Sequence, residues 1–102
     1  MQEKKKRGVK GLNITKLPYE VKVYMNNQVL IPAQLIRSLG LTDATYSRIK
    51  FKYRDKTFEI EVKLLRTKYT DSRQFSIPKE IRTKIGLLPG NTIKILDIQK
   101  IK

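Results

Sequence analysis

The sequence contains neither cysteine nor histidine, and these two absences exclude several classes of function. Without cysteine the chain can form no disulfide and offers no thiol nucleophile. Without histidine it lacks the commonest general base, and zinc sites built from Cys and His are excluded. An enzyme would have to work with carboxylates, Lys, Tyr and Ser alone. We therefore expect a protein that is not an enzyme and has no catalytic residue, metal site or cofactor.

Long apolar stretches are also missing. No apolar run approaches the roughly 20 residues that a membrane span requires. The first residues, MQEKKKRGVKG, are basic, but no apolar segment follows them as it would in a secretory signal. The absence of cysteine fits a reducing compartment. These features favour a cytoplasmic protein that has no membrane partner.

Acidic residues are few. The chain has nine Asp and Glu and 23 Lys and Arg, which gives a net charge of +14. A surface with this charge repels itself, so a polyanion is the expected partner. Nucleic acid is the first candidate and an anionic membrane is the second. Residues 1–16 carry many cations and too few apolar residues to order themselves. We expect a flexible basic tail there and a single domain over residues 17–102.

The rest of the chain contains one pattern twice. QVLIPAQLIRSLGL starts at Gln28 and QFSIPKEIRTKIGL starts at Gln74, an offset of 46 residues. In each copy a predicted strand ends in Ile-Pro, the proline suits the first turn of a helix, and a glycine ends that helix. Apolar residues four positions apart form a stripe that we expect in the core. The two stripes are Ile31, Leu35 and Leu39 in the first copy and Ile77, Ile81 and Ile85 in the second.

Each copy is too small to form a stable core alone. We therefore predict two tandem repeats, about 17–62 and 63–102, that bury each other's apolar faces around a local twofold axis. The alternating stretch YEVKVYM, the turn formers Asn26-Asn27 and the stretch QVLI predict a hairpin at the start of the first repeat.

A second hairpin is predicted over residues 48–64, with a two-residue turn at Asp55-Lys56. This register places Tyr53 opposite Phe58 on the apolar face. On the polar face it gives opposite-charge pairs, which stabilise a ladder modestly. These predicted pairs are Lys52 with Glu59 and Lys50 with Glu61. We interpret this face as a solvated, salt-paired surface rather than as a phosphate-binding stripe or a pair of catalytic carboxylates.

The second copy, RQFSIPKEIRTKIGLLPGNTIKIL over residues 73–96, resembles the core motif of the SpoVT/AbrB swapped-hairpin domains. That motif has a basic residue or Gln, a short strand ending in Ile-Pro, KEIR, an apolar-Gly-apolar step, and a Pro-Gly or Glu-Gly turn. The first copy, residues 28–51, keeps this frame but lacks KEIR and the glycine turn. The resemblance implies a mainly β fold with two short helices, arranged as a swapped-hairpin pseudo-dimeric barrel within one chain. A homodimer is the alternative assembly.

The resemblance also implies DNA binding and the residues for it. Arg82 stands at the KEIR arginine, and Gln74 stands where the family has Arg or Gln four residues before the proline. Gln28 matches Gln74, whereas Ile36 replaces Arg82 in the first copy and leaves its neighbour Arg37 as the substitute. Arginine reads guanine edges, glutamine reads adenine, and lysine holds phosphates. The candidate DNA-binding residues are Lys4, Lys5, Lys6, Arg7, Asn27, Gln28, Arg37, Lys68, Arg73, Gln74, Lys79, Arg82 and Lys84.

The repeat, the motif and the charge together predict a nucleoid-associated protein that binds double-stranded DNA, a transcriptional regulator of the SpoVT/AbrB type. Two alternatives remain open at this point. One is an antitoxin-like module that binds another protein. The other is a basic protein that binds RNA or coats chromatin.

Overall fold

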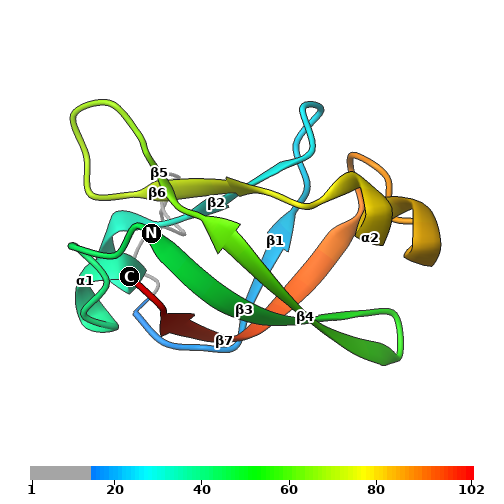
Figure 1. Ribbon diagram of the computed structural model, residues 1–102, viewed down its shortest axis with the longest axis horizontal. Coiled ribbons are helices and arrows are strands. Elements are labelled where there is room, and N and C mark those ends of the chain that lie inside the picture. The colour runs from blue at the N-terminus through cyan, green and yellow to red at the C-terminus, as the bar shows by residue number, and fades with distance from the viewer. Residues whose placement is uncertain (1–14) are drawn as a thin grey trace, which may run out of the picture.

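The computed structural model describes residues 15–102 and consists mainly of β-strands with two short helices, as predicted (Figure 1). The strands are β1 (Tyr19–Lys22), β2 (Gln28–Ile31), β3 (Tyr46–Tyr53), β4 (Lys56–Lys63), β5 (Leu65–Arg66), β6 (Arg73–Ser76) and β7 (Thr92–Lys100), and the helices are α1 (Ala33–Ser38) and α2 (Lys79–Ile85). Within residues 15–102, no helix has the length and apolar character needed to cross a bilayer.

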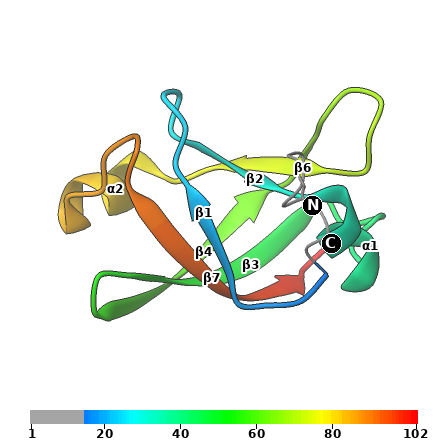
Figure 2. The same cartoon turned by 180° about the vertical axis from the view of Figure 1, so that it is seen from behind.

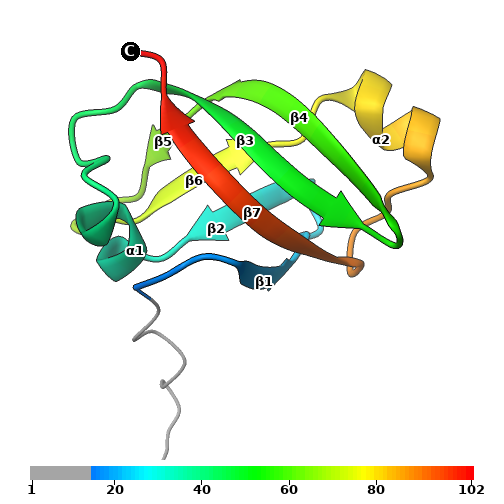
Figure 3. The same cartoon turned by 90° about the horizontal axis from the view of Figure 1, so that it is seen from below.

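The strands form two antiparallel sheets, which lie one over the other (Figure 3). The larger sheet has the order β1-β7-β3-β4, and the smaller has the order β2-β6-β5. The residues described here do not form a closed barrel, and the swapped-hairpin arrangement of the expected pseudo-dimeric barrel stays a prediction. β1 pairs with β7; next to β2, the Tyr24 amide N donates to the Gln28 carbonyl O at 2.9 Å at the turn, and the Tyr19 hydroxyl donates to the Leu30 carbonyl O at 3.3 Å. The hydrogen-bonded ladder therefore does not continue from one sheet into the other.

The core lies between the two sheets and follows the period-two pattern of the strands. Exposed and buried residues alternate along the whole of β3, and its Ile49 and Phe51 have no exposed surface. The two predicted apolar stripes are only partly buried. Ile31, Leu35 and Ile77 are buried, whereas Leu39, Ile81 and Ile85 pack against the core from its margin. Helix α2 consequently has no fully buried residue, in contrast to α1.

The repeated elements are related by a local twofold axis in the small sheet. Val29 of β2 pairs with Phe75 of β6, and these two residues occupy the same place in the repeat. The pair Gln28–Ser76 is mirrored by the pair Leu30–Gln74. The helices α1 and α2 lie at opposite ends of the long axis of the molecule (Figure 1). The division into swapped-hairpin repeats at about residue 62 stays a prediction.

The register of the β3–β4 hairpin differs from the prediction by two residues. Tyr53 pairs with Lys56, so the turn consists of Arg54 and Asp55, with Arg54 in the left-handed region at φ 58°. A two-residue shift keeps every side chain on its predicted face. The charged partners change, however: Lys50 lies opposite Glu59, Arg48 opposite Glu61, and Lys52 opposite Thr57. The observed register stacks Phe51 against Phe58, with ring centroids 5.6 Å apart, which favours it over the predicted pairing.

Candidate nucleic-acid interface

The outward side chains of β2 and β6 form one surface, which we call the ribbon face; its Ser76 is exposed and its other residues are half-buried. It consists of Gln28, Leu30, Gln74 and Ser76. The alternate residues of both strands, including Val29 and Phe75, point into the core and are fully buried. Directly paired residues of an antiparallel ladder share a face. The structure therefore brings the two predicted glutamines to one surface, on either side of the local twofold axis.

Two loops rise beside the ribbon face, on the same side of the molecule (Figures 1 and 2). In the 23–27 loop, the Asn26 Oδ1 accepts from the Gln28 amide N at 3.1 Å, and the Asn26 Nδ2 donates to the Gln28 Oε1 at 3.0 Å. These two bonds hold the Gln28 side chain at the base of the loop. Asn27, another predicted contact residue, takes the left-handed conformation at φ 64°. Its Oδ1 is buried and has no hydrogen-bond partner in the described part of the chain.

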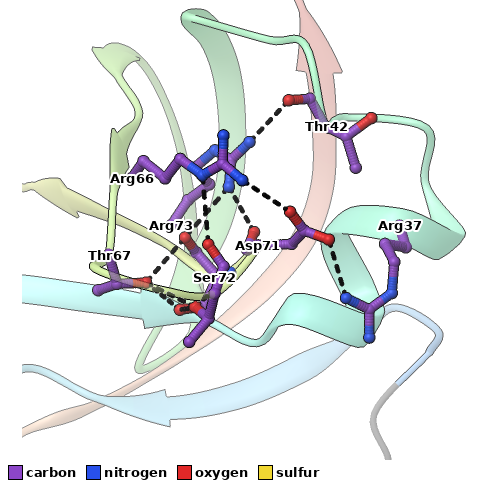
Figure 4. Close-up of polar contacts among 8 residues, drawn as sticks. Arg37, Thr42, Arg66, Thr67, Asp71, Ser72 and Arg73 are labelled. Atoms are coloured by element: carbon purple, nitrogen blue, oxygen red, sulfur yellow. Dashed lines mark hydrogen bonds and ion pairs between the residues drawn. The ribbon is translucent and has the colours of Figure 1, made fainter.

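The 67–72 loop is fixed to α1 by a carboxylate that binds two arginines (Figure 4). The Asp71 Oδ2 lies 3.0 Å from the Arg37 Nη1, and its Oδ1 lies 3.2 Å from the Arg66 Nη2. Inside the loop, the Thr67 Oγ1 donates to the Ser72 carbonyl O at 2.9 Å. Both guanidinium groups remain exposed, so the cluster presents two cations and one anion to solvent.

Arg73 was predicted to contact DNA, but the structure buries it at 3% exposure. Its Nη2 donates to the Thr42 carbonyl O at 2.7 Å, and its Nη1 donates to the carbonyl O atoms of Asp71 at 2.5 Å and Ser72 at 3.2 Å. The guanidinium thus binds carbonyl groups of the 67–72 loop from the interior of the protein and is not available to a ligand. The period of two along a strand could have predicted this burial, because Arg73 stands two positions before the buried Phe75 and therefore lies on the same face of β6.

The remaining basic candidates of the second copy do not form one cluster. Lys68 lies in the 67–72 loop, at the α1 end of the molecule, with its Nζ 5.3 Å from the Tyr69 ring centroid. Lys79 and Lys84 are exposed on α2, at the opposite end. Arg82 is half-buried, and its Nε donates to the Ile77 carbonyl O at 2.9 Å, which ties α2 to the end of β6.

Each end of the molecule combines the helix of one copy with the hairpin loop of the other. At the α1 end, Arg37 binds Asp71 of the 67–72 loop. At the α2 end, the Ile77 amide N donates to the Asn27 carbonyl O at 3.2 Å, and the Gly90 amide N donates to the Val23 carbonyl O at 2.7 Å. The candidate residues therefore fall into two groups, one at each end of the ribbon face.

The outer face of the large sheet has a different character, because its charges are largely balanced. The Arg48 Nη2 lies 2.8 Å from the Glu61 Oε2, and this carboxylate raises the pKa of Arg48. Lys50 lies between Glu59 on β4 and Asp97 on β7. Acidic and basic residues do lie opposite each other on this face, as predicted, although the individual pairs differ from those predicted. We do not include it in the interface.

Three further features of the interface were not among the predicted contact residues. Arg66 shares Asp71 with Arg37, and Met25 and Tyr69 stand at the loop tips with 89% and 93% of their surface exposed. Only the fold of the two loops reveals these positions. Lys4, Lys5, Lys6 and Arg7 lie outside the described residues. Residues 15–102 contain no group of three or more side chains arranged to hold a metal ion.

Comparison with known proteins gives one informative result. No family model and no curated protein matches the chain. Among solved structures, the solution structure of PHS018 from Pyrococcus horikoshii is similar, with a TM-score of 0.59 and 24% sequence identity. The match covers 82% of this chain and 92% of that one. At this level of identity the similarity concerns the fold, which the two proteins share over most of their length.

Proposed function

We propose that this protein binds double-stranded DNA and acts as a transcriptional regulator of the SpoVT/AbrB type. The observation that carries the proposal is the symmetric placement of the half-buried Gln28 and Gln74 on one outward face of the ribbon, in a chain with a net charge of +14. Duplex DNA has local twofold symmetry of its own, and its major groove admits a two-stranded β-ribbon. In this proposal the two tandem repeats interleave their hairpins and act as a dimer fused into one chain.

The proposed roles follow from the chemistry of each side chain. Gln28 and Gln74 hydrogen-bond adenine edges from the ribbon face. The cations at the two ends of that face hold phosphates and set the register on the duplex. These cations are Arg37, Arg66 and Lys68 at one end and Lys79, Arg82 and Lys84 at the other. The basic residues Lys4 to Arg7 add further phosphate contacts and bring the protein to the nucleoid.

The dimensions of the molecule support this arrangement. Its long axis measures 43 Å, and α1 and α2 lie at the two ends of that axis. Successive turns of the major groove are roughly 34–36 Å apart. The molecule is therefore long enough to span about one turn of the duplex, so the basic groups at its two ends can reach phosphates beyond the groove that the ribbon face enters.

The test is duplex binding measured by fluorescence anisotropy over a range of salt concentrations. Neutralising about six phosphates lowers the affinity roughly a thousandfold between 50 and 200 mM salt. Gln74→Ala should reduce discrimination between a selected duplex and its scrambled version, whereas Lys79→Gln should weaken binding to both. Lys63→Gln, at the far end of β4, is the matched control for the loss of one charge.

Three outcomes would redirect the proposal. Binding that does not change with salt would rule out phosphate contacts as its basis. Equal affinity for selected and scrambled duplexes would indicate a chromatin-coating protein instead of a regulator. Tighter binding of structured RNA than of duplex DNA in direct competition would indicate an RNA-binding protein.

A further inference from the structure

A groove of about 400 Å³ lies between α2 and the turn that joins β3 to β4. The two elements lie at the same end of the molecule in Figures 1 and 3. The floor of the groove is apolar and consists of Tyr53, Phe58 and Ile85, and its charged lining consists of Arg54, Asp55, Lys56 and Lys84. The β3–β4 turn carries none of the predicted DNA contacts, so most of this groove is independent of the ribbon face.

The floor is held firmly by contacts to the rest of the fold. The Tyr53 Oη donates to the Asn91 Oδ1 at 2.9 Å, and Asn91 follows α2 in the chain. Phe58 stacks against the buried Phe51, with ring centroids 5.6 Å apart. The groove therefore presents a preformed apolar floor, whose aromatic surface comes mainly from the half-buried Phe58 because Tyr53 is only 7% exposed; a preformed floor reduces the entropy that is lost on binding.

The cations of the groove have no ion-pair partner among the described residues. Within residues 15–102, no ion pair joins Arg54, Lys56 or Lys84 to a carboxylate, whereas Arg37 and Arg48 both have such partners. The Arg54 guanidinium carbon lies 5.1 Å from the Tyr53 ring centroid, so this cation is placed over the aromatic floor. The groove thus concentrates positive charge around apolar surface and carries a single acid, Asp55.

We propose that this groove binds a phosphorylated nucleoside. Aromatic surface beside cations is the arrangement with which proteins stack a base and hold its phosphate. The volume suits a small-molecule ligand, because ligand sites typically enclose about 300–1,000 Å³. Asp55 supplies a hydrogen-bond acceptor for the amino group of adenine, cytosine or guanine. An acidic peptide fits less well, because it has no planar group to use the aromatic floor.

The proposal is tested by titrating the full-length, isotope-labelled protein and recording backbone amide spectra. ATP should shift the amide signals of Phe58 and Ile85, and inorganic tripolyphosphate should bind at least about fivefold more weakly, since it cannot stack. Lys56→Gln should weaken ATP binding about two- to fivefold, as expected for an exposed charge contact. Lys63→Gln, at the other end of the same strand, should leave it unchanged.

The same titrations contain the results that would overturn the proposal. Equal affinity for tripolyphosphate and ATP would show a simple anion patch, and shifts confined to other regions would place the site elsewhere. Displacement of ATP by a Glu- and Leu-rich peptide of lower dissociation constant would show a peptide site. The affinity of the groove for a deoxyadenosine hexanucleotide is compared with its affinity for ATP. Tighter binding of the hexanucleotide indicates the end of a single strand as the ligand, and tighter binding of ATP indicates a free nucleotide. Lys56→Gln should not change duplex binding, so the two proposals can fail separately.

Discussion

Arg73 shows how the role of one residue depends on its side of a strand. The same basic side chain would be a surface contact one position earlier or later in β6. Its actual position directs the guanidinium inward, where three carbonyl O atoms satisfy it. A buried charge is tolerated only with such partners. Arg73 therefore links the 67–72 loop to the segment after α1 through these carbonyl groups.

Replacing Arg73 with lysine should lower the free energy of unfolding by about 1–3 kcal/mol, because an ammonium group cannot reach all the carbonyls that the planar guanidinium binds. Chemical denaturation of the purified proteins measures the difference. Arg66→Lys is the matched control, since Arg66 is exposed and its change should stay within about 0.5 kcal/mol. Equal stability of the two variants would contradict the structural role of Arg73.

Tyr19 makes the stability dependent on pH in the alkaline range. Burial, and secondarily the charge of Tyr24, raises the pKa of Tyr19 above its ordinary value of 10.0. Above that pH the unfolded chain has lost a proton that the folded chain keeps, so the free energy of unfolding decreases as pH rises through the folded pKa. Tyr19→Phe should show a smaller decrease between pH 9 and 11 in denaturation experiments, because it lacks the phenol that titrates differently in the folded and unfolded chains. An identical decrease would contradict the assignment.

At the scale of elements, the two helices share their sequence pattern but differ in how they are stabilised. Helix α1 buries Leu35 and Ile36, whereas α2 rests on the core through partly buried residues. Helix α2 depends more on its ends, where Arg82 binds the Ile77 carbonyl O and Gly86 caps the helix in the left-handed conformation at φ 71°. The element that carries three proposed phosphate contacts is therefore the less firmly packed of the two.

Gly86→Ala should destabilise the protein by about 1 kcal/mol, because a residue with a Cβ is disfavoured in the left-handed region. The added Cβ would meet no atom within 4 Å, so conformational strain is the sole expected cause. Thr83→Ala, on the exposed side of the same helix, is the control and should change stability by less than about 0.5 kcal/mol. Thermal unfolding of the two variants measures the difference, and a neutral Gly86→Ala would show that the cap contributes little.

At the scale of the whole molecule, charge and symmetry act together. The twofold pairing of β2 with β6 places one helix and one loop at each end, and the helix and loop at each end come from different copies. Most of the described cations are exposed on a chain with a net charge of +14, and among the described acids Asp43, Glu61 and Asp71 form ion pairs. An excess of like charge destabilises the compact state and favours a polyanionic partner.

Screening should therefore stabilise the free protein. We expect the melting temperature to rise when salt is increased from about 10 to 150 mM, because the Debye length shortens to about 8 Å and weakens repulsion between distant cations. Differential scanning calorimetry without nucleic acid measures this change. A melting temperature that falls with salt would show that local ion pairs, such as Lys100 with Asp43 at 2.9 Å, outweigh the repulsion.

The sequence by itself determined the elements whose signals are local. Strand alternation, Ile-Pro at the start of each helix and glycine after each helix depend on neighbouring residues, and they predicted both helices, the alternation of β3 and the inward set of Ile31, Leu35 and Ile77. The internal repeat predicted that the two copies would pack together around a local twofold axis, and the equivalent residues Val29 and Phe75 pair in the small sheet.

Only the tertiary structure decided the relations between segments that are distant in the sequence. A shift of two residues in the β3–β4 hairpin leaves the burial pattern unchanged, so periodicity cannot distinguish the two registers. The pairing of β1 with β7, which left two sheets in place of a barrel, depends on competition between partners for a strand edge. The contact between each loop and the helix of the other copy likewise depends on packing across the twofold axis. No local sequence pattern predicts which distant surface a loop will contact.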